Sequence, residues 1–396
     1  MALGFGRSFS SYTQNCRLKV LITNRVLVRG SGTEIVVRDL ALELKKLGHE
    51  PAIYAPVLGP LAEQVRTLGV PVFSDIRQIE PVPDIIHGHH HAQTLTALLR
   101  FSDTPAIFVC HDATAWHDEP LIFPRVLRYV AVDYRCRKRL EQNTWIPPES
   151  ISVILNAVDL SRFRPRSPLP TKPVRAAIFS NYASKWTHAT AVTQACQAMG
   201  IELDVIGKGS NAATSNPEQI LPRYDLVFAK ARCALEAMAI GSAVVLCDFA
   251  GLGPLVSADK FAELRKLNFG AGTLLRPLDP QLIATEIQKY DAHDAQLVSE
   301  QVRQAASLSD AMTEWTELYR EVLDRRVPDR QVQDQRPDQN HHALELAAVA
   351  EYLVKWGYDA RIAWEKERIE KVLRWPVLGR WFKRVMEREQ IRILQK

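Results

Sequence analysis

The stretch YDLVFAKARCALEAMAIGSAVVLCD, residues 224–248, decides the fold. Its apolar runs at 226–228 and 243–247 have the length and composition of buried strands. The segment 232–240 between them has the apolar spacing of a helix. A strand, a helix and a second strand in this order predict one unit of a buried parallel sheet.

The same alternation extends in both directions from this stretch. Before it, a loop with Gly30 and Gly32 leads from the first strand into a helix at 33–47 that ends at Gly48. The repetition predicts an α/β fold with open, mostly parallel sheets. The expected strands are 18–23, 51–54, 70–73, 84–87, 106–110, 129–132 and 151–155 in the first series, and 174–179, 203–206, 226–228 and 243–247 in the second.

Two stretches divide the chain. RPRSPLPTKP at 164–173 holds four prolines and resists both helix and strand, and 325–342 is polar with few apolar residues. We therefore expect two Rossmann-like domains at 17–165 and 166–325 that face each other across a cleft. A polar linker at 326–342 and a basic helical extension at 343–396 would follow. Open sheets bind ligands at the carboxyl ends of their strands, so the functional residues should lie just after strands.

Composition narrows the class of protein. The 396 residues are 46% hydrophobic and 24% charged, which is typical of a globular chain. A net charge of +5 argues against a dedicated nucleic-acid binder. Six scattered cysteines without a C-x-x-C pair favour reduced thiols, and there is no long apolar segment or secretory signal. We expect a cytoplasmic protein.

The glycine-bearing turn RGSGTE, residues 29–34, is the first candidate for a binding site. Backbone N–H groups at the start of the following helix, near Gly32 and Thr33, could bind a diphosphate. The simpler alternative is a turn that binds nothing, because this is not the G-x-G-x-x-G pattern.

Histidines form the second candidate. His87, His89, His90 and His91 follow one strand, and His111 with Asp112 follows another. The H-x-H-H-H spacing is not that of a zinc enzyme, so we predict no metal and interpret the histidines as polar lining of the cleft. His111 suits a functional role, whereas His87 fits a buried, structural position.

Glu236 lies in the most specific motif. EAMAIG at 236–241 resembles the E-A-[ML]-A-x-G helix of GT-B glycosyltransferases of the large family-4 group, in which the carboxylate holds the ribose of the donor. Five further segments resemble the same family in the same order over about residues 17–325: the glycine turn GSGTE at 30–34, DIIHGH at 84–89, VCHD at 109–112, VILNAVDLSRFRP at 153–165 and FSNYASKW at 179–186.

This resemblance implies a transferase that takes a sugar from a nucleotide-sugar donor to a hydroxyl acceptor, retains the anomeric configuration and needs no cofactor. It implies that Glu236 binds ribose and that Lys185 binds the diphosphate. Lys230 and Arg232 would add positive charge for the leaving group. The full set of expected site residues is His111 and Lys185 for catalysis; Gly32, Thr33, Lys185, Lys230, Arg232 and Glu236 for the donor; and His89, Asp112 and Asn156 on the acceptor side.

The sequence also departs from the family pattern. The usual E-x(7)-E pair is incomplete because Phe228 stands eight positions before Glu236, and Ala157 follows Asn156 where the family has glycine. Two alternatives therefore stay open beside the transferase: a non-catalytic nucleotide-sugar-binding or scaffold protein, and a nucleotide-sugar epimerase.

The C-terminal segment 371–396 has eight basic and two acidic residues, interleaved with tryptophan, phenylalanine and aliphatic side chains. This pattern favours peripheral binding to an anionic membrane at its inner face, next to a glycan or lipid-linked acceptor. A helix packed on the protein itself or on another subunit is the alternative. No nucleic-acid partner is expected.

Overall fold

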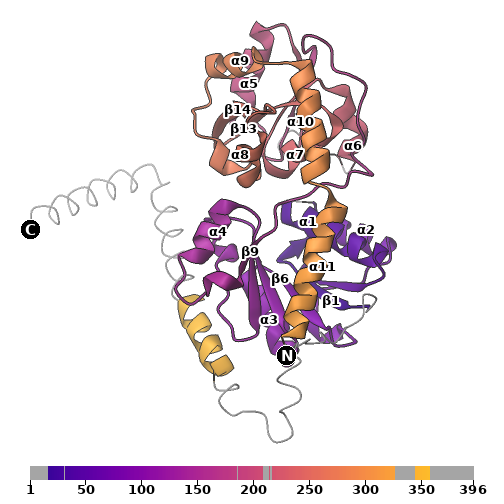
Figure 1. Cartoon of the computed structure of the whole chain (residues 1–396), viewed down its shortest axis with the longest axis vertical. Coiled ribbons are helices and arrows are strands. Elements are labelled where there is room, and N and C mark those ends of the chain that lie inside the picture. The colour runs from indigo at the N-terminus through magenta and orange to yellow at the C-terminus, as the bar shows by residue number, and fades with distance from the viewer. Residues whose placement is uncertain are drawn as a thin grey trace, which may run out of the picture. The chain divides into compact units, whose positions relative to one another are not determined.

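The computed structural model describes residues 17–30, 32–184, 186–207, 214, 216–325 and 344–356. These residues belong to two compact units. The first unit contains both sheets of the α/β fold and ends with helix α11, whereas residues 122–124 and the helix at 344–356 belong to the second. Figure 1 labels the helices and several of the strands of the first unit.

The first sheet has seven parallel strands in the order β5-β3-β1-β6-β7-β8-β9. A separate two-stranded sheet pairs β2 with β4. The strands are β1 (Lys19–Thr23), β2 (Val26–Leu27), β3 (Glu50–Tyr54), β4 (Val57–Leu58), β5 (Val72–Phe73), β6 (Ile85–His89), β7 (Ala106–Cys110), β8 (Val126–Ala131) and β9 (Ile151–Val153).

The second sheet has five strands in the order β11-β10-β12-β13-β14, and all neighbours are parallel except the antiparallel pair β13 and β14. Its strands are β10 (Arg175–Phe179), β11 (Glu202–Ile206), β12 (Leu226–Ala229), β13 (Ala243–Asp248) and β14 (Gly251–Leu255). The α/β class and the parallel sheets predicted from the sequence are confirmed.

Helices connect the strands, as parallel sheets require. They are α1 (Gly32–Lys46), α2 (Pro60–Thr67), α3 (His91–Arg100), α4 (Tyr134–Glu141), α5 (Ala189–Ala198), α6 (Pro217–Ile220), α7 (Ala231–Ile240), α8 (Phe261–Lys266), α9 (Pro280–Ile287), α10 (Ala292–Ala305) and α11 (Leu308–Asp324).

The two faces of the second sheet bury alternate residues of its strands. Val227 and Ala229 of β12 belong to the hydrophobic cluster that includes α7, whereas Leu226 and Phe228 belong to the cluster that includes α5 and α9. This alternation follows from the two-residue period of a strand. Phe228 is fully buried, so the position where the family has a carboxylate is a core position here.

Helix α11 follows the second sheet in sequence but packs against elements of the first. The Tyr319 hydroxyl lies 2.6 Å from His87 Nδ1, and the Trp315 ring centroid lies 4.7 Å from that of His87. Glu321 pairs with Arg128 of β8. His87 is therefore a buried residue with a packing role, as its position in a strand predicted.

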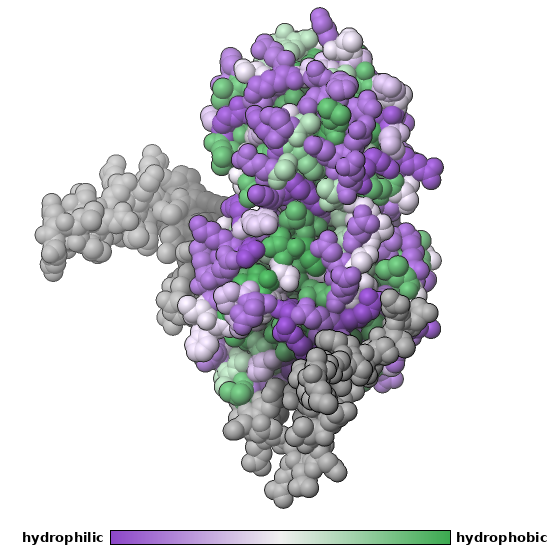
Figure 2. Space-filling view, in the orientation of Figure 1, coloured by the Kyte–Doolittle hydropathy of each residue, from purple (hydrophilic) through white to green (hydrophobic). Residues whose placement is uncertain are grey.

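The described helix of the second unit spans residues 344–356 and exposes Leu344, Leu353 and Val354. None of the described helices is long and apolar enough to cross a bilayer. On the face in Figure 2, hydrophilic residues cover most of the surface and hydrophobic residues form small groups. The rest of the predicted basic extension lies outside the described residues.

Candidate functional site

A pocket of about 620 Å³ lies in the first unit, where strands of both sheets end. Phe179 ends β10, Ile206 ends β11, and α7 begins directly after β12. The first sheet contributes Gly30 and Gly32, which follow β1 and β2. This volume is in the range of small-molecule sites, and the location is the one that the sequence predicted.

The glycine turn shapes one wall of this pocket. Gly30 has a φ of +77°, a backbone conformation that favours glycine, and α1 begins two residues later at Gly32. Glu34 is buried, and its carboxylate accepts hydrogen bonds from the N–H groups of Val28 and Arg29. The turn is thus fixed before a ligand binds. Thr33 lies on α1 but is not among the residues that line the pocket.

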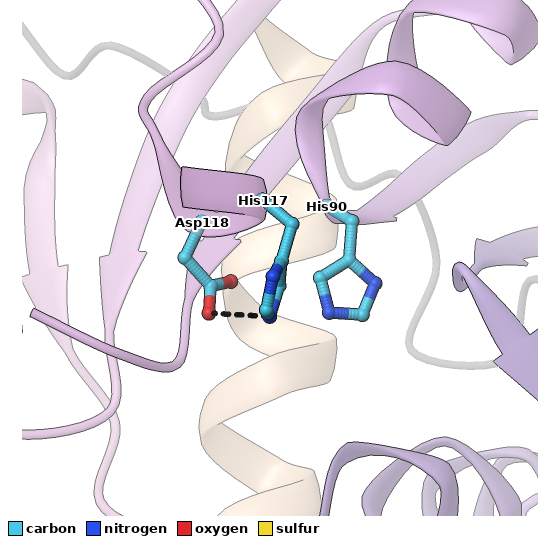
Figure 3. Close-up of side chains that lie close together, drawn as sticks. All are labelled: His90, His117 and Asp118. Carbon is cyan, nitrogen blue, oxygen red and sulfur yellow. Dashed lines mark ion pairs between the residues drawn. The ribbon is translucent and has the colours of Figure 1, made fainter. Parts of the chain in front are cut away.

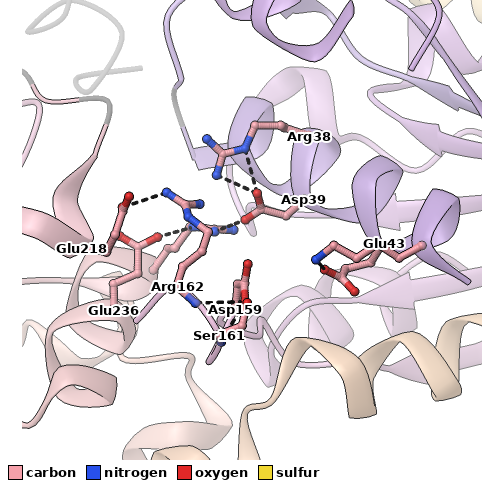
Figure 4. A network of polar contacts seen from close by, with 10 residues as sticks. Arg38, Asp39, Glu43, Asp159, Ser161, Arg162, Glu218 and Glu236 are labelled. Carbon is pink, nitrogen blue, oxygen red and sulfur yellow. Dashed lines mark hydrogen bonds and ion pairs between the residues drawn. The ribbon is translucent and has the colours of Figure 1, made fainter. Parts of the chain in front are cut away.

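Glu236 lines the pocket and belongs to a polar network (Figure 4). This network joins the two halves of the first unit, which are the first sheet with its helices and the second sheet with its helices. Arg232 donates from Nε to Glu236 Oε1 at 2.8 Å, one helical turn away on α7, and also pairs with Asp39 of α1. Arg38 donates to the same Asp39 carboxylate at 2.8 Å. A second pair, Arg162 with Glu218 at 2.8 Å, lies in the same network.

Burial and pairing set the charges of this network. Burial raises the pKa of Glu236, although Arg232 opposes part of that rise. Burial would also raise the pKa of Asp39, but Arg232 and Arg38 together hold it below its usual value. Burial alone would lower the pKa of Arg232, yet the Asp39 and Glu236 carboxylates raise it, so the guanidinium stays charged.

The pocket lining is cationic. Four arginines line it, namely Arg29, Arg38, Arg162 and Arg232, whereas Glu236 is the one carboxylate among the lining residues of the described chain. Guanidinium groups bind phosphate oxygens with two donors each. Arg38, Arg162 and Arg232 already pair with Asp39, Glu218 and Glu236, but each guanidinium has five N–H donors. The lining therefore suits an anionic ligand through the donors that remain, with a hydroxyl-bearing part near Glu236.

His89 and His111 lie next to this pocket, at the ends of β6 and β7. Their nitrogens Nδ1 and Nε2 are 2.5 Å apart, and both residues line a small cavity of about 40 Å³ together with Asn156 and Arg232. Burial lowers the pKa of His111 to about 4 and that of His89 well below its usual value. Both rings are therefore neutral near pH 7.

His90, His117 and Asp118 form a second polar group (Figure 3), whose candidate ligand atoms lie within 4.8 Å of one another. Two histidines and a carboxylate are a common zinc donor set. However, His90 Nδ1 accepts the N–H of Arg25 at 3.0 Å, which places the proton of the neutral ring on Nε2. A metal-binding histidine normally donates from its second nitrogen, so His90 does not fit a metal ligand.

The remaining predicted residues occupy different places. Asp112 is exposed, and its carboxylate accepts the N–H groups of Thr114 and Ala115 within its own loop. Asn156 donates its N–H to Asn268 Oδ1 at 3.2 Å. Lys230 pairs with Asp248 at 2.8 Å and does not line the pocket. Lys185 lies outside the described residues.

Sequence reasoning missed Arg38, Asp39 and Arg162. Asp39 and Arg232 are 193 positions apart, so no local spacing could join them. Arg162 could have been predicted, because it lies within the VILNAVDLSRFRP motif that resembles the family.

The protein has two Rossmann-like sheets, a pocket at the carboxyl ends of their strands and a helix, α11, that packs back on the first sheet. Together these features define a GT-B-type protein. The chain's residues 30–162 match the family model of Glycosyltransferase Family 4. The predicted resemblance to family-4 GT-B glycosyltransferases is thereby confirmed. No curated protein matches the sequence.

Solved structures agree on the fold. A glycosyltransferase from Rickettsia africae ESF-5 is 15% identical with a TM-score of 0.57, and the match covers 78% of this chain and 99% of that one. Anabaena Alr3699/HepE in complex with UDP and glucose is 14% identical with a TM-score of 0.55, over 76% of this chain and 99% of its own. At these identities the likeness shows a shared fold.

Proposed function

We propose that this protein is a glycosyltransferase that moves a hexosyl group from a nucleotide-sugar donor to a hydroxyl acceptor. The observation that carries the proposal is the pocket of about 620 Å³, in which the Glu236 carboxylate stands among four arginines. A carboxylate can accept from both vicinal hydroxyls of a ribose, and guanidinium groups complement a diphosphate.

In the proposed reaction the bond between the anomeric carbon and the diphosphate breaks and the acceptor oxygen bonds to that carbon. The proton of the acceptor hydroxyl passes to an oxygen of the departing diphosphate. Negative charge grows on the leaving diphosphate, where Arg232 and its neighbours would stabilise it electrostatically. Gly32, Thr33 and Lys185 remain proposed donor-binding residues, with Lys185 directed to the diphosphate. Retention of configuration is part of the proposal and rests on the family resemblance alone.

The acceptor would bind on the side of the first sheet, near His89, His111, Asp112 and Asn156. Because burial holds the pKa of His111 near 4, its ring would act as a neutral hydrogen-bonding group that orients the acceptor hydroxyl. We propose a glycan or lipid-linked acceptor in cell-surface polysaccharide or glycolipid synthesis. The basic segment 371–396 would hold the enzyme at the inner face of the membrane.

Calorimetry with UDP, GDP and their hexose conjugates tests the donor site directly. UDP-glucose is the first donor to try, since the Anabaena structure holds UDP and glucose. Binding followed by transfer to an acceptor would support the proposal. Binding without transfer would favour the scaffold alternative, and an epimerised nucleotide sugar formed without acceptor would favour the epimerase. No binding of any nucleotide would reject the donor site.

Two variants assign the roles. Glu236→Ala should abolish donor binding, because the ribose loses its acceptor. Lys185→Ala should weaken binding of the nucleoside diphosphate more than binding of the free nucleoside. Equal weakening of both would show that Lys185 does not bind the diphosphate.

A further inference from the structure

A second cluster of side chains lies at the carboxyl ends of the strands of the second sheet, outside the lining of the pocket. Lys230 follows β12, and its Nζ lies 2.8 Å from Oδ2 of Asp248, the last residue of β13. The same Nζ lies 5.0 Å from the ring centroid of Phe249 and 5.6 Å from that of Tyr182. Three chain segments thus bring an ammonium, a carboxylate and two aromatic rings together.

The two rings face solvent although they stand over a charged pair. Tyr182 is 59% exposed and Phe249 is 50% exposed, with ring centroids 5.2 Å apart and planes inclined by 59°. Exposed aromatic groups of this kind commonly mark binding sites. The negative face of an aromatic ring attracts positively polarised C–H groups, which line one face of many hexose rings.

Beneath the rings, buried polar atoms lack partners. His188 is fully buried, and neither of its ring nitrogens has a hydrogen-bond partner. Asp248 Oδ1 lies 3.9 Å from His188 Nδ1, which is too long for a hydrogen bond. Asp248 is itself 1% exposed. A buried polar group without a partner costs free energy. The ring nitrogens of His188 can therefore still accept or donate a hydrogen bond.

The cluster adjoins the pocket. Asn181 lines the pocket and directly precedes Tyr182, and Arg232 lines it two residues after Lys230. Because Lys230 and Asp248 neutralise each other, the cluster does not suit a free phosphate. A neutral polyol suits it better, since a hydroxyl can accept from the ammonium while its neighbour donates to the carboxylate.

We propose that Lys230, Asp248, Tyr182 and Phe249 form the subsite for a neutral hexose ring of the donor. The hydroxyls would bind the Lys230 and Asp248 pair, and the C–H face would stack on an aromatic ring. The subsite would supply the sugar contacts that Phe228 cannot, since Phe228 is buried in the core. This inference rests on the proposed function and specifies which residues recognise the sugar.

The test compares donor with nucleoside diphosphate by calorimetry. Each hexose conjugate from a panel of UDP-glucose, UDP-galactose and GDP-mannose that binds the wild-type protein is measured beside UDP or GDP. In Phe249→Ala and in the double variant Lys230→Met/Asp248→Asn, the affinity for the conjugate should fall by about tenfold or more. The affinity for the nucleoside diphosphate should change by less than about twofold. The double variant avoids leaving a buried carboxylate unpaired.

Leu275→Ala and Lys172→Met are matched controls, because both residues are exposed in the same half of the first unit and lie outside the cluster. They should leave both affinities unchanged. The subsite is wrong if the conjugate and the nucleoside diphosphate lose affinity equally, or if neither changes. If the wild-type protein binds no nucleotide at all, the proposed function fails first and the subsite with it.

Discussion

Arg232 is the residue on which the charges of the pocket depend. It lies between two buried carboxylates, Asp39 and Glu236, and its side chain is 12% exposed. Asp39 has a second partner in Arg38, whereas Arg232 is the cation that hydrogen-bonds Glu236. A buried carboxylate without a cation is strongly destabilising. Removing Arg232 should therefore destabilise the charged form of Glu236 far more than that of Asp39.

We expect Arg232→Met to lower the free energy of unfolding by about 3–5 kcal/mol near pH 7, because the buried Glu236 carboxyl loses its cation and must either stay charged without a partner or take up a proton. The double variant Arg232→Met/Glu236→Gln should recover a large part of that loss, since no buried charge remains at position 236. Urea unfolding of the four proteins of the cycle measures the coupling. Additive effects of the two substitutions would contradict a direct interaction.

Asp118 offers a test by pH. Burial raises its pKa to about 7, above the value of 3.8 that applies to the unfolded chain. Between these values the folded state binds the proton more tightly, so this carboxyl reduces stability as pH rises from about 4 to about 7. Asp118→Asn removes the titration. Its stability relative to wild type should increase by about 2–3 kcal/mol between pH 5 and pH 8, measured by urea unfolding.

Titratable groups other than Asp118 are the same in both proteins, so their contributions cancel in the stability difference between Asp118→Asn and wild type. Glu202→Gln, an exposed carboxyl in the second half of the first unit, is the control and should show a flat difference over the same range. A difference for Asp118→Asn that does not change with pH would mean that the buried carboxyl is not protonated near neutrality.

Residues that act through local motifs could be predicted from the sequence, and those that act through distant contacts could not. Glu236 was predicted because EAMAIG is a contiguous pattern, and the structure places it in the pocket. The partners that set its charge state are visible only after folding, because Arg232 reaches Asp39 across 193 positions. Lys230 was expected to contact the donor diphosphate. Its ion pair with Asp248 could not be predicted, because it forms only where the ends of β12 and β13 lie side by side.

At the scale of elements, the loop between α8 and the following turn joins the two halves of the first unit. Asn268 in this loop has a φ of +49°, and its side chain donates to the Val132 carbonyl beyond β8. Its Oδ1 accepts from Arg265 at 2.7 Å and from the Asn156 N–H at 3.2 Å. One buried amide thus satisfies three groups from three parts of the chain.

Asn268→Ala should therefore lower the free energy of unfolding by about 2–3 kcal/mol, because a buried carbonyl, a half-buried N–H and a guanidinium all lose their partner. The left-handed backbone adds to this cost for alanine. The urea midpoint measures the loss. Asn216→Ala, an exposed residue before α6, is the control and should stay within about 0.5 kcal/mol of wild type. A similar small change at Asn268 would show that the loop does not join the two halves.

Elements with a strong apolar period were predicted, and irregular ones were missed. The helix expected at 33–47 is α1 at Gly32–Lys46, and the strand expected at 106–110 is β7. Strand β14, with the sequence GLGPL, was not predicted, because glycine and proline lower the strand signal. It is the antiparallel edge of the second sheet, stabilised by its pairing with β13.

For the whole molecule, the order of strands and helices predicted the α/β class, but not the path of the last helix. Nothing in the sequence of α11 shows that this helix returns to the first sheet. That return depends on contacts such as Tyr319 with His87, 232 positions apart. The halves of the first unit are thus joined by α11 as well as by the contacts of Arg232 and Asn268. These contacts favour a pocket whose lining residues from the two sheets stay together.

The C-terminal extension gives the last prediction. Residues 371–396 carry a net charge of +6 by sequence, from eight basic and two acidic side chains, with apolar and aromatic residues between them. Each basic residue near an anionic surface contributes about 1 kcal/mol to binding, and salt weakens this attraction. Deletion after His342 should therefore strongly reduce sedimentation with phosphatidylserine-containing vesicles at low salt.

The same truncation should leave nucleotide affinity unchanged, because every residue that lines the pocket lies before residue 237. Vesicles of phosphatidylcholine alone are the control and should bind both proteins weakly. Raising the salt concentration should reduce binding of the full chain to anionic vesicles, as expected for an electrostatic attachment. If the truncated protein sediments with anionic vesicles as well as the full chain does, the extension is not a membrane anchor, and packing on the protein or on another subunit becomes its explanation.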